Sequence, residues 1–388
     1  MITEKYKKMY DLFIGFYKDK HVNPWHEINE EELNNIYDKI VLEQNIVDDY
    51  SFNYLMNYVI KRLGGVLDAH TQYSVMQRIP INFKMFGKEI IVNFPDDLKG
   101  LNLVSINGVL IDVIIDELDD VIAYGTEGKR KYEIEKALFN KQRLFSLPSL
   151  RGANILIMNF KDSNGNIYVK KFKKDEQYLE SEMFDAEKYL FGNPGTFNIF
   201  GNKLVITHSS VQNRFKEKIE NMVEELKKLD LSSIDTIIVD IRGNTGGNSA
   251  INKCLMDFLE NCNKKLICLT DYRVFSGGRY ALINLIELGA ITIGTGISTP
   301  LNHYGNSGWI KYNGYTFASS TCFLAPNVGV AAFSKEDYSL KVTKDVTIPK
   351  FFKPDIFVEQ SKEDYINGVD TVMAYAFKYA DQIKFKKK

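Results

Sequence analysis

The sequence has few cysteines, and they do not form a disulfide pattern. The four cysteines among 388 residues include no Cys-x-x-Cys pair, and three of them, Cys254, Cys262 and Cys268, crowd into one short segment. This spacing suits reduced thiols and excludes the disulfide framework of small secreted domains. We therefore expect a reducing environment and a cytoplasmic location.

The sequence also lacks an excess of charge of one sign, a long apolar run and a secretory signal. Its 49 basic and 50 acidic residues give a formal net charge of −1, so the composition indicates no nucleic-acid partner. The longest apolar region, residues 281–297, is interrupted by Asn284 and Glu287. This region predicts a core helix followed by a strand, so we expect no membrane partner. The N-terminal stretch shows no small-residue cleavage site.

Three regions of different character follow one another along the chain. Residues 1–78 carry apolar residues at a spacing of three and four, which predicts a helical N-terminal region. Residues 79–175 contain short β-rich runs separated by turn signals such as Asn107-Gly108, which predicts a small β-rich module. From 176 to 388, apolar strands alternate with helical stripes in a βαβαβ pattern. The fold class is therefore α/β, with a parallel sheet covered by helices.

The two most distinctive loops of the third region each follow an apolar strand. The stretch "DIRGNTGG", residues 240–247, places three glycines within five residues. The stretch "VFSGG", residues 274–278, places Ser276 at the start of a predicted helix. Ligands and catalytic groups lie at the carboxyl ends of the strands in parallel sheets of this kind. We therefore expect a functional site built from these two loops.

The glycine-rich loop matches neither of the two familiar phosphate-binding motifs. A Walker loop needs a lysine after its last glycine, and none follows Gly247. A dinucleotide fingerprint needs GxGxxG, whereas the spacing here is GxxGG. Two alternatives remain open from the residues alone. One is a tight crossover anchored by Asp240 and Arg242, and the other is an anion hole made by the N–H groups of Gly246 and Gly247.

In order and spacing, several stretches of this chain resemble the S41 peptidases, the family of C-terminal processing and tricorn-type proteases. The core of the family resembles "TIIVDIRGNTGGN", "LTDYRVFSGGRYAL" and "AITIGTG", and its Asp-x-His-Thr segment resembles "GGVLDAHTQYS". Its "ING" stretch resembles "LVSINGVLIDVIIDEL", and the resemblance spans about residues 50–380. The resemblance implies a ClpP-like or crotonase-like core, a PDZ-like or degenerate β module, and a serine endopeptidase acting on a peptide or protein without a metal or organic cofactor.

The resemblance also implies a role for individual residues. Ser276 would be the nucleophile, and the backbone N–H groups of Gly246, Gly247 and Gly277 would form the oxyanion hole. His70 matches the general base of the tricorn-like branch, and histidine can remove a serine proton near neutral pH because its ordinary pKa is about 6.5. The Ser–Lys branch of the family is disfavoured, because residues 294–310 contain no lysine.

Three points stay open at the level of sequence. His303 is an alternative base, and Ser276 has a plain interpretation as a helix N-cap. No residue clearly matches the third triad member, for which the acids possible by type alone are Glu287, Glu336, Asp345 and Asp355. Asp68 is close to His70 in sequence but has an alternative role as a turn cap, and turn and cap roles are favoured for Asp355 and Asp364. The missing acid encourages a rival function, a catalytically inactive peptide-binding protein on the same scaffold. A crotonase-type acyl-CoA enzyme would share the glycine donors but would not explain a serine between strand and helix.

Overall fold

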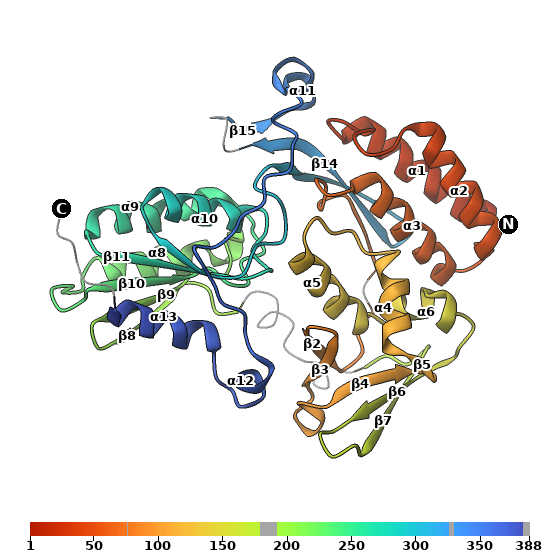
Figure 1. The fold of residues 1–388 in the computed structure, drawn as a ribbon. Coiled ribbons are helices and arrows are strands. Elements are labelled where there is room, and N and C mark those ends of the chain that lie inside the picture. Colours follow the sequence, from red (N-terminus) through yellow and green to blue (C-terminus); the bar gives the residue numbers. More distant parts are fainter. Residues whose placement is uncertain (76, 179–191, 326–329, 383–388) are drawn as a thin grey trace. The chain divides into compact units, whose positions relative to one another are not determined.

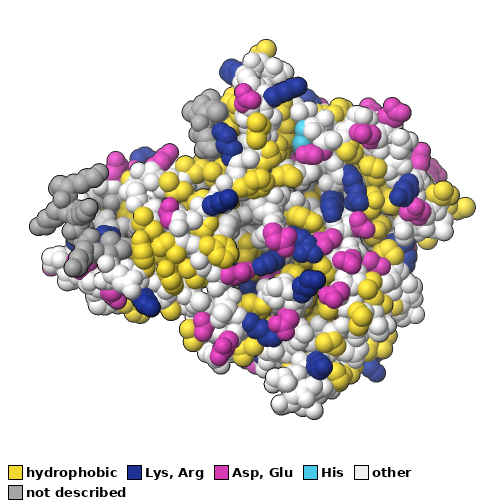
Figure 2. Space-filling view, in the orientation of Figure 1, with side chains coloured by type: hydrophobic (Ala, Val, Ile, Leu, Met, Phe, Trp, Pro, Cys, Tyr) yellow, Lys and Arg dark blue, Asp and Glu magenta, His cyan; other side chains and the backbone are white. Residues whose placement is uncertain are grey.

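The computed structural model describes residues 1–75, 77–178, 192–325 and 330–382 (Figure 1). The chain forms two compact units, one of Met1–Phe184 with Thr299–Lys350 and the other of Asp185–Ser298 with Phe351–Lys388. Residues 299–350 belong to the first unit, whereas the sequence pattern placed them in the third region, 176–388. In the described residues, no helix is long and apolar enough to cross a membrane. Figure 2 shows basic and acidic side chains intermixed on the visible face, as the balanced charge predicts.

The first unit begins with the predicted helical region. Its helices are α1 (Glu4–Lys20), α2 (Glu30–Gln44) and α3 (Asp49–Gly64). Asn29 and Asp48 begin α2 and α3 with capping boxes, in which each side chain accepts a hydrogen bond from a backbone N–H of the first turn. These caps satisfy N–H groups that the helix itself leaves without an acceptor, so the boundaries of both helices are fixed locally.

The β-rich module of the first unit is an antiparallel sheet with the strand order β2-β3-β4-β6-β7, and β5 pairs with β4. Asn107 and Gly108 have φ values of 51° and 80°, so they form the tight turn that the sequence predicts between β4 and β5. The elements are β2 (Asn82–Phe86), β3 (Glu89–Phe94), η1 (Asp96–Leu98), β4 (Asn102–Ile106), β5 (Val109–Leu110), α4 (Ile111–Asp119), α5 (Glu127–Leu138), α6 (Lys141–Ser146), η2 (Pro148–Leu150), β6 (Ile155–Lys161) and β7 (Ile167–Lys173).

A second sheet of the first unit joins segments from both ends of the chain. The hairpin of β13 (His303–Tyr312) and β14 (Tyr315–Ala325) pairs through β14 with β1 (Gln72–Ser74) and β15 (Val330–Phe333). Helix α1 packs on β14, where Phe13 lies 5.7 Å from Phe317 between ring centroids. Helix α11 (Lys335–Lys341) follows β15. Because β1 comes directly after His70, this sheet determines where His70 lies within the unit.

The second unit contains the parallel sheet that the sequence predicts. Its strand order is β16-β12-β11-β10-β9-β8, and all neighbours are parallel except the edge pair β8 and β9. Helices α9 and α10 cover one face and α13 covers the other (Figure 1). The elements are β8 (Thr196–Phe200), β9 (Lys203–Thr207), η4 (Asn213–Phe215), α8 (Lys216–Leu226), β10 (Thr236–Asp240), η5 (Ser249–Ile251), α9 (Asn252–Cys262), β11 (Lys265–Thr270), α10 (Gly277–Glu287), β12 (Ile291–Gly294), β16 (Ile356–Phe357), α12 (Lys362–Ile366) and α13 (Thr371–Gln382).

The core on the α13 side of this sheet is made of β-branched and aliphatic side chains. Ile238 of β10 and Ile267 of β11 are fully buried there, against Val372 and Ala376 of α13. Near-continuous apolar strands of this kind are typical of parallel sheets that are covered on both faces. The sheet therefore supplies a rigid base for the loops that leave its carboxyl edge.

We expect the substitution Ile238→Ala to lower the free energy of unfolding by about 2–5 kcal/mol, because it leaves a cavity in this core. Urea unfolding followed by far-UV circular dichroism measures the change. Leu42→Ala is the control, since Leu42 is 78% exposed and its truncation should change the free energy by no more than about 0.5 kcal/mol. Equal unfolding midpoints for Ile238→Ala and the native chain would contradict the packing described here.

Candidate active site

Ser276 lies in a strained turn between β11 and α10. Its φ of 48° and ψ of −117° fall where a residue with a side chain is disfavoured by about 1–3 kcal/mol. It occupies the N-cap position of α10, yet its side chain makes no capping hydrogen bond. A plain capping role therefore does not explain the serine. A strained serine between a strand and a helix is the geometry of a nucleophile elbow, which exposes the hydroxyl.

The glycine-rich loop that follows β10 packs backbone against backbone on the serine turn. A Cβ placed on Gly246 would lie 2.8 Å from the Cβ of Ser276 and 2.6 Å from the backbone N of Gly277. A Cβ placed on Gly277 would lie 2.7 Å from the carbonyl O of Gly247. Gly246 and Gly247 also have φ values of 98° and 129°. Both the close approach and the backbone conformation therefore require glycine at these positions.

The hydrogen bonds of the three glycines differ. The N–H of Gly246 donates to Oδ1 of Asn244 at 3.1 Å, so this donor is already used. The N–H groups of Gly247 and Gly277 have no acceptor within the described part of the chain. A Cβ on Gly277 would lie 3.0 Å from the N of Gly247, so the two groups lie in adjacent backbones. Of the three glycines that the sequence suggests as donors, Gly247 and Gly277 keep an available N–H, and Gly246 permits the close approach.

Asn244 connects the two loops from within the glycine-rich stretch. Its side chain is fully buried, and its Nδ2 donates to the carbonyl O of His208 at 2.7 Å while its Oδ1 accepts from Gly246. Its own carbonyl O accepts from the N–H of Phe275, the residue before Ser276, at 2.9 Å. The carbonyl of Asn244 thus joins the glycine loop to the serine turn, and its side chain ties the glycine loop to His208.

A buried histidine and asparagine support the start of α10. The Nε2 of His208 lies 2.7 Å from Oδ1 of Asn252, and Nδ2 of Asn252 donates to the carbonyl O of Gly277 at 3.4 Å. Burial lowers the pKa of His208, which favours a neutral ring whose Nε2–H donates to Asn252. The sequence assigned neither residue a role, because His208 follows β9 and Asn252 begins α9 without a recognisable motif.

Two Asp-x-Arg turns fix the loops at the carboxyl edge of the sheet. Asp240 accepts from the backbone N and the Nε of Arg242 at 3.0 and 2.8 Å, and Arg242 also makes two bonds of 2.8 and 2.7 Å to Asp370. Burial opposes the charge of Asp370, but the bonds from Arg242 outweigh it and lower the pKa of this carboxyl. The next turn begins at Asp271, whose carboxylate accepts from the N–H of Gly243 at 2.9 Å. The anchoring predicted for Asp240 and Arg242 is thus present together with the glycine donors.

His70 belongs to the other compact unit, where it lies between α3 and β1. Its Nδ1 lies 3.1 Å from the carbonyl O of Tyr304, and its ring stacks on that of His303 with 5.3 Å between centroids. A carbonyl can only accept, so this contact assigns the proton to Nδ1 and leaves Nε2 as an acceptor. In a neutral ring, this is the tautomer that a general base needs.

Asp68 is the buried anchor of the segment that carries His70. Its carboxylate accepts from Ser320 Oγ at 2.6 Å, from the N–H groups of His70 and Thr71 at 3.0 Å, and from Nε2 of His21 at 3.1 Å. Burial would raise the pKa of Asp68, but the bonds from His21 and Ser320 outweigh it and hold the pKa well below its usual range. Asp68 therefore does more than cap a turn, because it fixes His70 and Thr71 to β14.

The remaining candidates from the sequence have other partners or exposed positions. His303 is fully buried, with its Nδ1 3.1 Å from the carbonyl O of Pro300. Asp355 accepts from both the N–H and the hydroxyl of Thr292 at 2.8 Å, which pins β16 beside β12. Asp364 accepts from Thr371 Oγ1 at 2.6 Å beside the first turn of α12. The other acids considered by type, which are exposed, are Glu287, Glu336 and Asp345.

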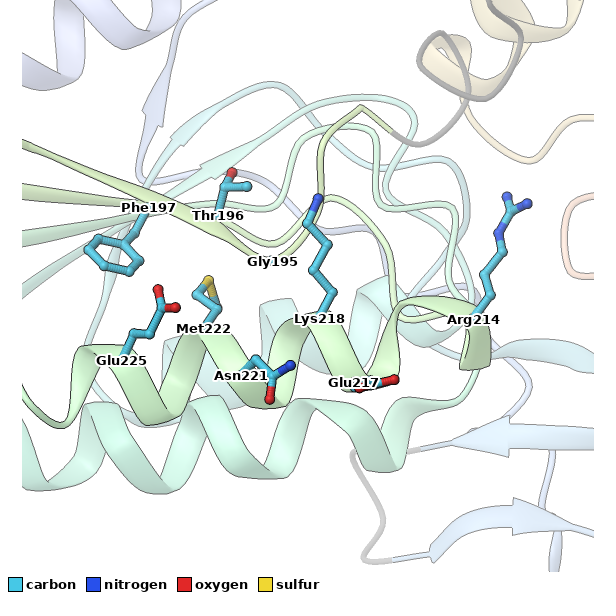
Figure 3. A pocket seen from close by; sticks show the side chains of 9 residues that line it. All are labelled: Gly195, Thr196, Phe197, Arg214, Glu217, Lys218, Asn221, Met222 and Glu225. Carbon is cyan, nitrogen blue, oxygen red and sulfur yellow. The ribbon is translucent and has the colours of Figure 1, made fainter.

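A polar pocket of about 560 Å³ lies between the start of β8 and α8, in the same unit as Ser276. Figure 3 shows Lys218 reaching toward Gly195 while Glu225 reaches toward Phe197. Val211, which precedes the pocket residue Arg214 by three positions, pairs with Gly247 in a parallel bridge. The lining includes Arg214, Lys218, Glu217 and Glu225, so the pocket carries both signs of charge and favours no ligand of one sign.

Comparison with known proteins identifies the fold through structure and not through sequence. A scan against protein-family models found no match, and a search of curated proteins also found none. The structure of mature CPAF complexed with lactacystin is similar over 93% of this chain and 94% of that chain, with 9% identity and a TM-score of 0.62. The structure of mature CPAF is similar over 94% and 93%, with 9% identity and a TM-score of 0.57. At these identities the likeness shows the fold alone, which is a mixed α/β fold similar to that of mature CPAF.

Proposed function

We propose that this chain is a serine peptidase that cleaves peptide bonds through an acyl-enzyme on Ser276. The observation that carries the proposal is the strained serine turn packed against a glycine loop, where the N–H groups of Gly247 and Gly277 have no acceptor in the described ranges. Such preorganised donors stabilise the negative charge that develops on a carbonyl oxygen during acyl transfer. The resemblance of the stretches around Ser276, Gly246 and His70 to the S41 peptidases points to the same reaction class.

In the proposed reaction, the hydroxyl oxygen of Ser276 attacks the carbonyl carbon of the scissile bond while Nε2 of His70 takes the hydroxyl proton. The N–H groups of Gly247 and Gly277 bind the resulting oxyanion. The intermediate then expels the amine, which receives the proton from His70, and leaves an ester on Ser276. A water molecule attacks this ester while His70 takes its proton, and the carboxylic acid product leaves as the Ser276 oxygen regains that proton from His70. The mechanism requires the two units to bring Nε2 of His70 within about 2.6–3.2 Å of the Ser276 hydroxyl.

The orientation of His70 is assigned to a backbone group in this proposal. The carbonyl O of Tyr304 would hold Nδ1–H in the position that a carboxylate occupies in Ser-His-Asp triads. A neutral carbonyl sets the tautomer and the ring direction, but it stabilises the imidazolium less than a carboxylate does. We therefore expect His70 to act as a base and peptide hydrolysis to be slower than with a carboxylate partner.

A second candidate is a peptide-binding protein on the same scaffold without turnover. It is favoured by the engagement of Asp355 with Thr292 and of Asp364 with Thr371, which gives both acids structural partners. The two candidates differ in a single observable, because only the peptidase forms a covalent ester on Ser276.

We expect a fluorophosphonate probe to label Ser276 of the full chain, because the probe reacts with serine hydroxyls activated by a base and an oxyanion hole. Mass spectrometry of the digested adduct locates the label. Ser276→Ala should abolish labelling, whereas Ser232→Ala, a change at an exposed serine of the same unit, should leave it intact. Labelling that persists in Ser276→Ala would show another nucleophile, and no labelling of the native chain would favour the inactive binding protein.

The substitution Gly246→Ala should reduce peptidase activity by about 10²–10³-fold, because the added Cβ would push the glycine loop away from the serine turn and misplace the oxyanion donors. Initial rates on a peptide library measure the loss. Gly15→Ala is the matched control, since a Cβ on Gly15 meets nothing within 4 Å. If Gly246→Ala folds normally and retains native activity, the oxyanion hole lies elsewhere.

The substitution Asp68→Asn should lower the free energy of unfolding at neutral pH. The difference in free energy between the variant and the native chain should be smaller in acid. The pKa of Asp68 is depressed in the folded state, so its carboxylate stabilises the fold above its unfolded pKa of about 3.9. This contribution declines as the pH falls below about 4. Asparagine does not ionise, so the variant has no such contribution to lose. Urea unfolding between pH 3 and pH 7 measures the gap between the two chains. A gap that is equally large at both ends of this range would mean that the carboxylate charge is not what holds this segment.

A further inference from the structure

A second cavity lies in the first unit, among residues that the proposed mechanism does not use. Its volume is about 470 Å³, and its walls come from four separate segments. These segments are the first turn of α3, the connection from β1 to β2, the start of α6 and the chain just after β7. They contribute three cations, which are Arg78, Lys141 and Lys174.

Lys141 is a buried cation that the protein solvates incompletely. Its side chain is 4% exposed, and its Nζ donates to the carbonyl O of Glu176 at 2.6 Å. An ammonium group has three donors, and no carboxylate lies within ion-pair distance of this one in the part of the chain that the structure describes. Burial lowers the pKa of Lys141, which shows the cost of its position. An anion in the cavity would offset that cost.

Lys174 is held at the wall of the same cavity by aromatic rings. Its Nζ lies 4.0 Å from the ring centroid of Tyr50 and 5.6 Å from that of Phe145. Contacts of this kind attract the ammonium to the ring face while leaving its hydrogen-bond donors available to a ligand. Arg78 lines the cavity from the connection between β1 and β2. The cations therefore converge from different parts of the fold.

Two carboxylates also line the cavity. The carboxylate of Glu176 accepts from the hydroxyl of Tyr178 at 3.0 Å, and Asp175 is exposed. Among the described lining residues, the cations Arg78, Lys141 and Lys174 outnumber these carboxylates by one. The rings of Tyr50 and Tyr178 supply apolar surface beside these charges.

We propose that this cavity binds a small organic anion, whose carboxylate or phosphate group bonds to Lys141 and Lys174 while its apolar part packs on Tyr50. A volume of about 470 Å³ is larger than a bare ion needs and lies within the range of about 300–1,000 Å³ that is usual for small-molecule sites. Lysine and arginine are the usual partners of carboxylates and phosphates in proteins. The proposal does not depend on the peptidase function.

Isothermal titration calorimetry on the full chain tests the site with three probes of similar size. These are phenyl phosphate, phenylacetate and the neutral benzyl alcohol, each at low ionic strength. We expect saturable binding of at least one anion with one site per chain and no binding of benzyl alcohol. The comparison of the two anions decides between a phosphate and a carboxylate ligand. Absence of saturable binding for both anions would overturn the proposal.

Variants locate the bound anion. Lys141→Gln and Lys174→Gln should each weaken binding about tenfold or more, because each removes a charge-assisted hydrogen bond. Lys171→Gln is the matched control, since Lys171 is an exposed lysine of β7 outside the cavity lining. Circular dichroism checks the fold, and if Lys141→Gln unfolds, the half-buried Lys174 carries the test. If Lys141→Gln and Lys174→Gln both fold and bind the anion with native affinity, the anion binds elsewhere. The same conclusion follows if Lys171→Gln loses as much affinity for the anion as they do.

Discussion

The candidate site depends on the close approach of two backbones at the carboxyl edge of a parallel sheet. Strands β10 and β11 pair in register from Thr236 and Lys265 onward, so the loops after them leave the sheet as neighbours. There is no room for a side chain at Gly246 where the loops meet. This constraint leaves backbone N–H groups, and not side chains, facing the space beside Ser276. The donors that Gly247 and Gly277 offer beside Ser276 are therefore main-chain N–H groups.

The interactions around the two loops preserve this arrangement from different directions. Asn244 joins the loops to each other, and His208 with Asn252 supports the first residues of α10. Arg242 reaches Asp370, which lies 128 residues further along the chain at the start of α13. The final helix of the described chain is thus tied to the same edge. Because Asn244, His208 and Asn252 are buried and hydrogen-bonded, they specify one arrangement of the loops.

The sequence predicts those parts of the fold and site that depend on local pattern. The βαβαβ succession, the Asn107-Gly108 turn and the serine between strand and helix all follow from residues near one another, and the structure contains them. The partners of Asp68 and His70 were not predictable in this way, because Ser320 and Tyr304 are 252 and 234 residues distant. Serine and tyrosine at these separations leave no periodic signal. The return of residues 299–350 to the first unit escapes local reasoning for the same reason.

The contact between His70 and the carbonyl of Tyr304 has a consequence for evolution. A carboxylate partner can be deleted by one codon change, whereas a backbone carbonyl is present whichever side chain occupies position 304. The direction of the imidazole is therefore inherited from the register between β13 and the segment at Asp68. The Tyr304 side chain itself is buried and bonded to Tyr338, but its replacement would not remove the carbonyl as long as that register persists. Drift could thus replace residues around the histidine and still leave its ring aligned.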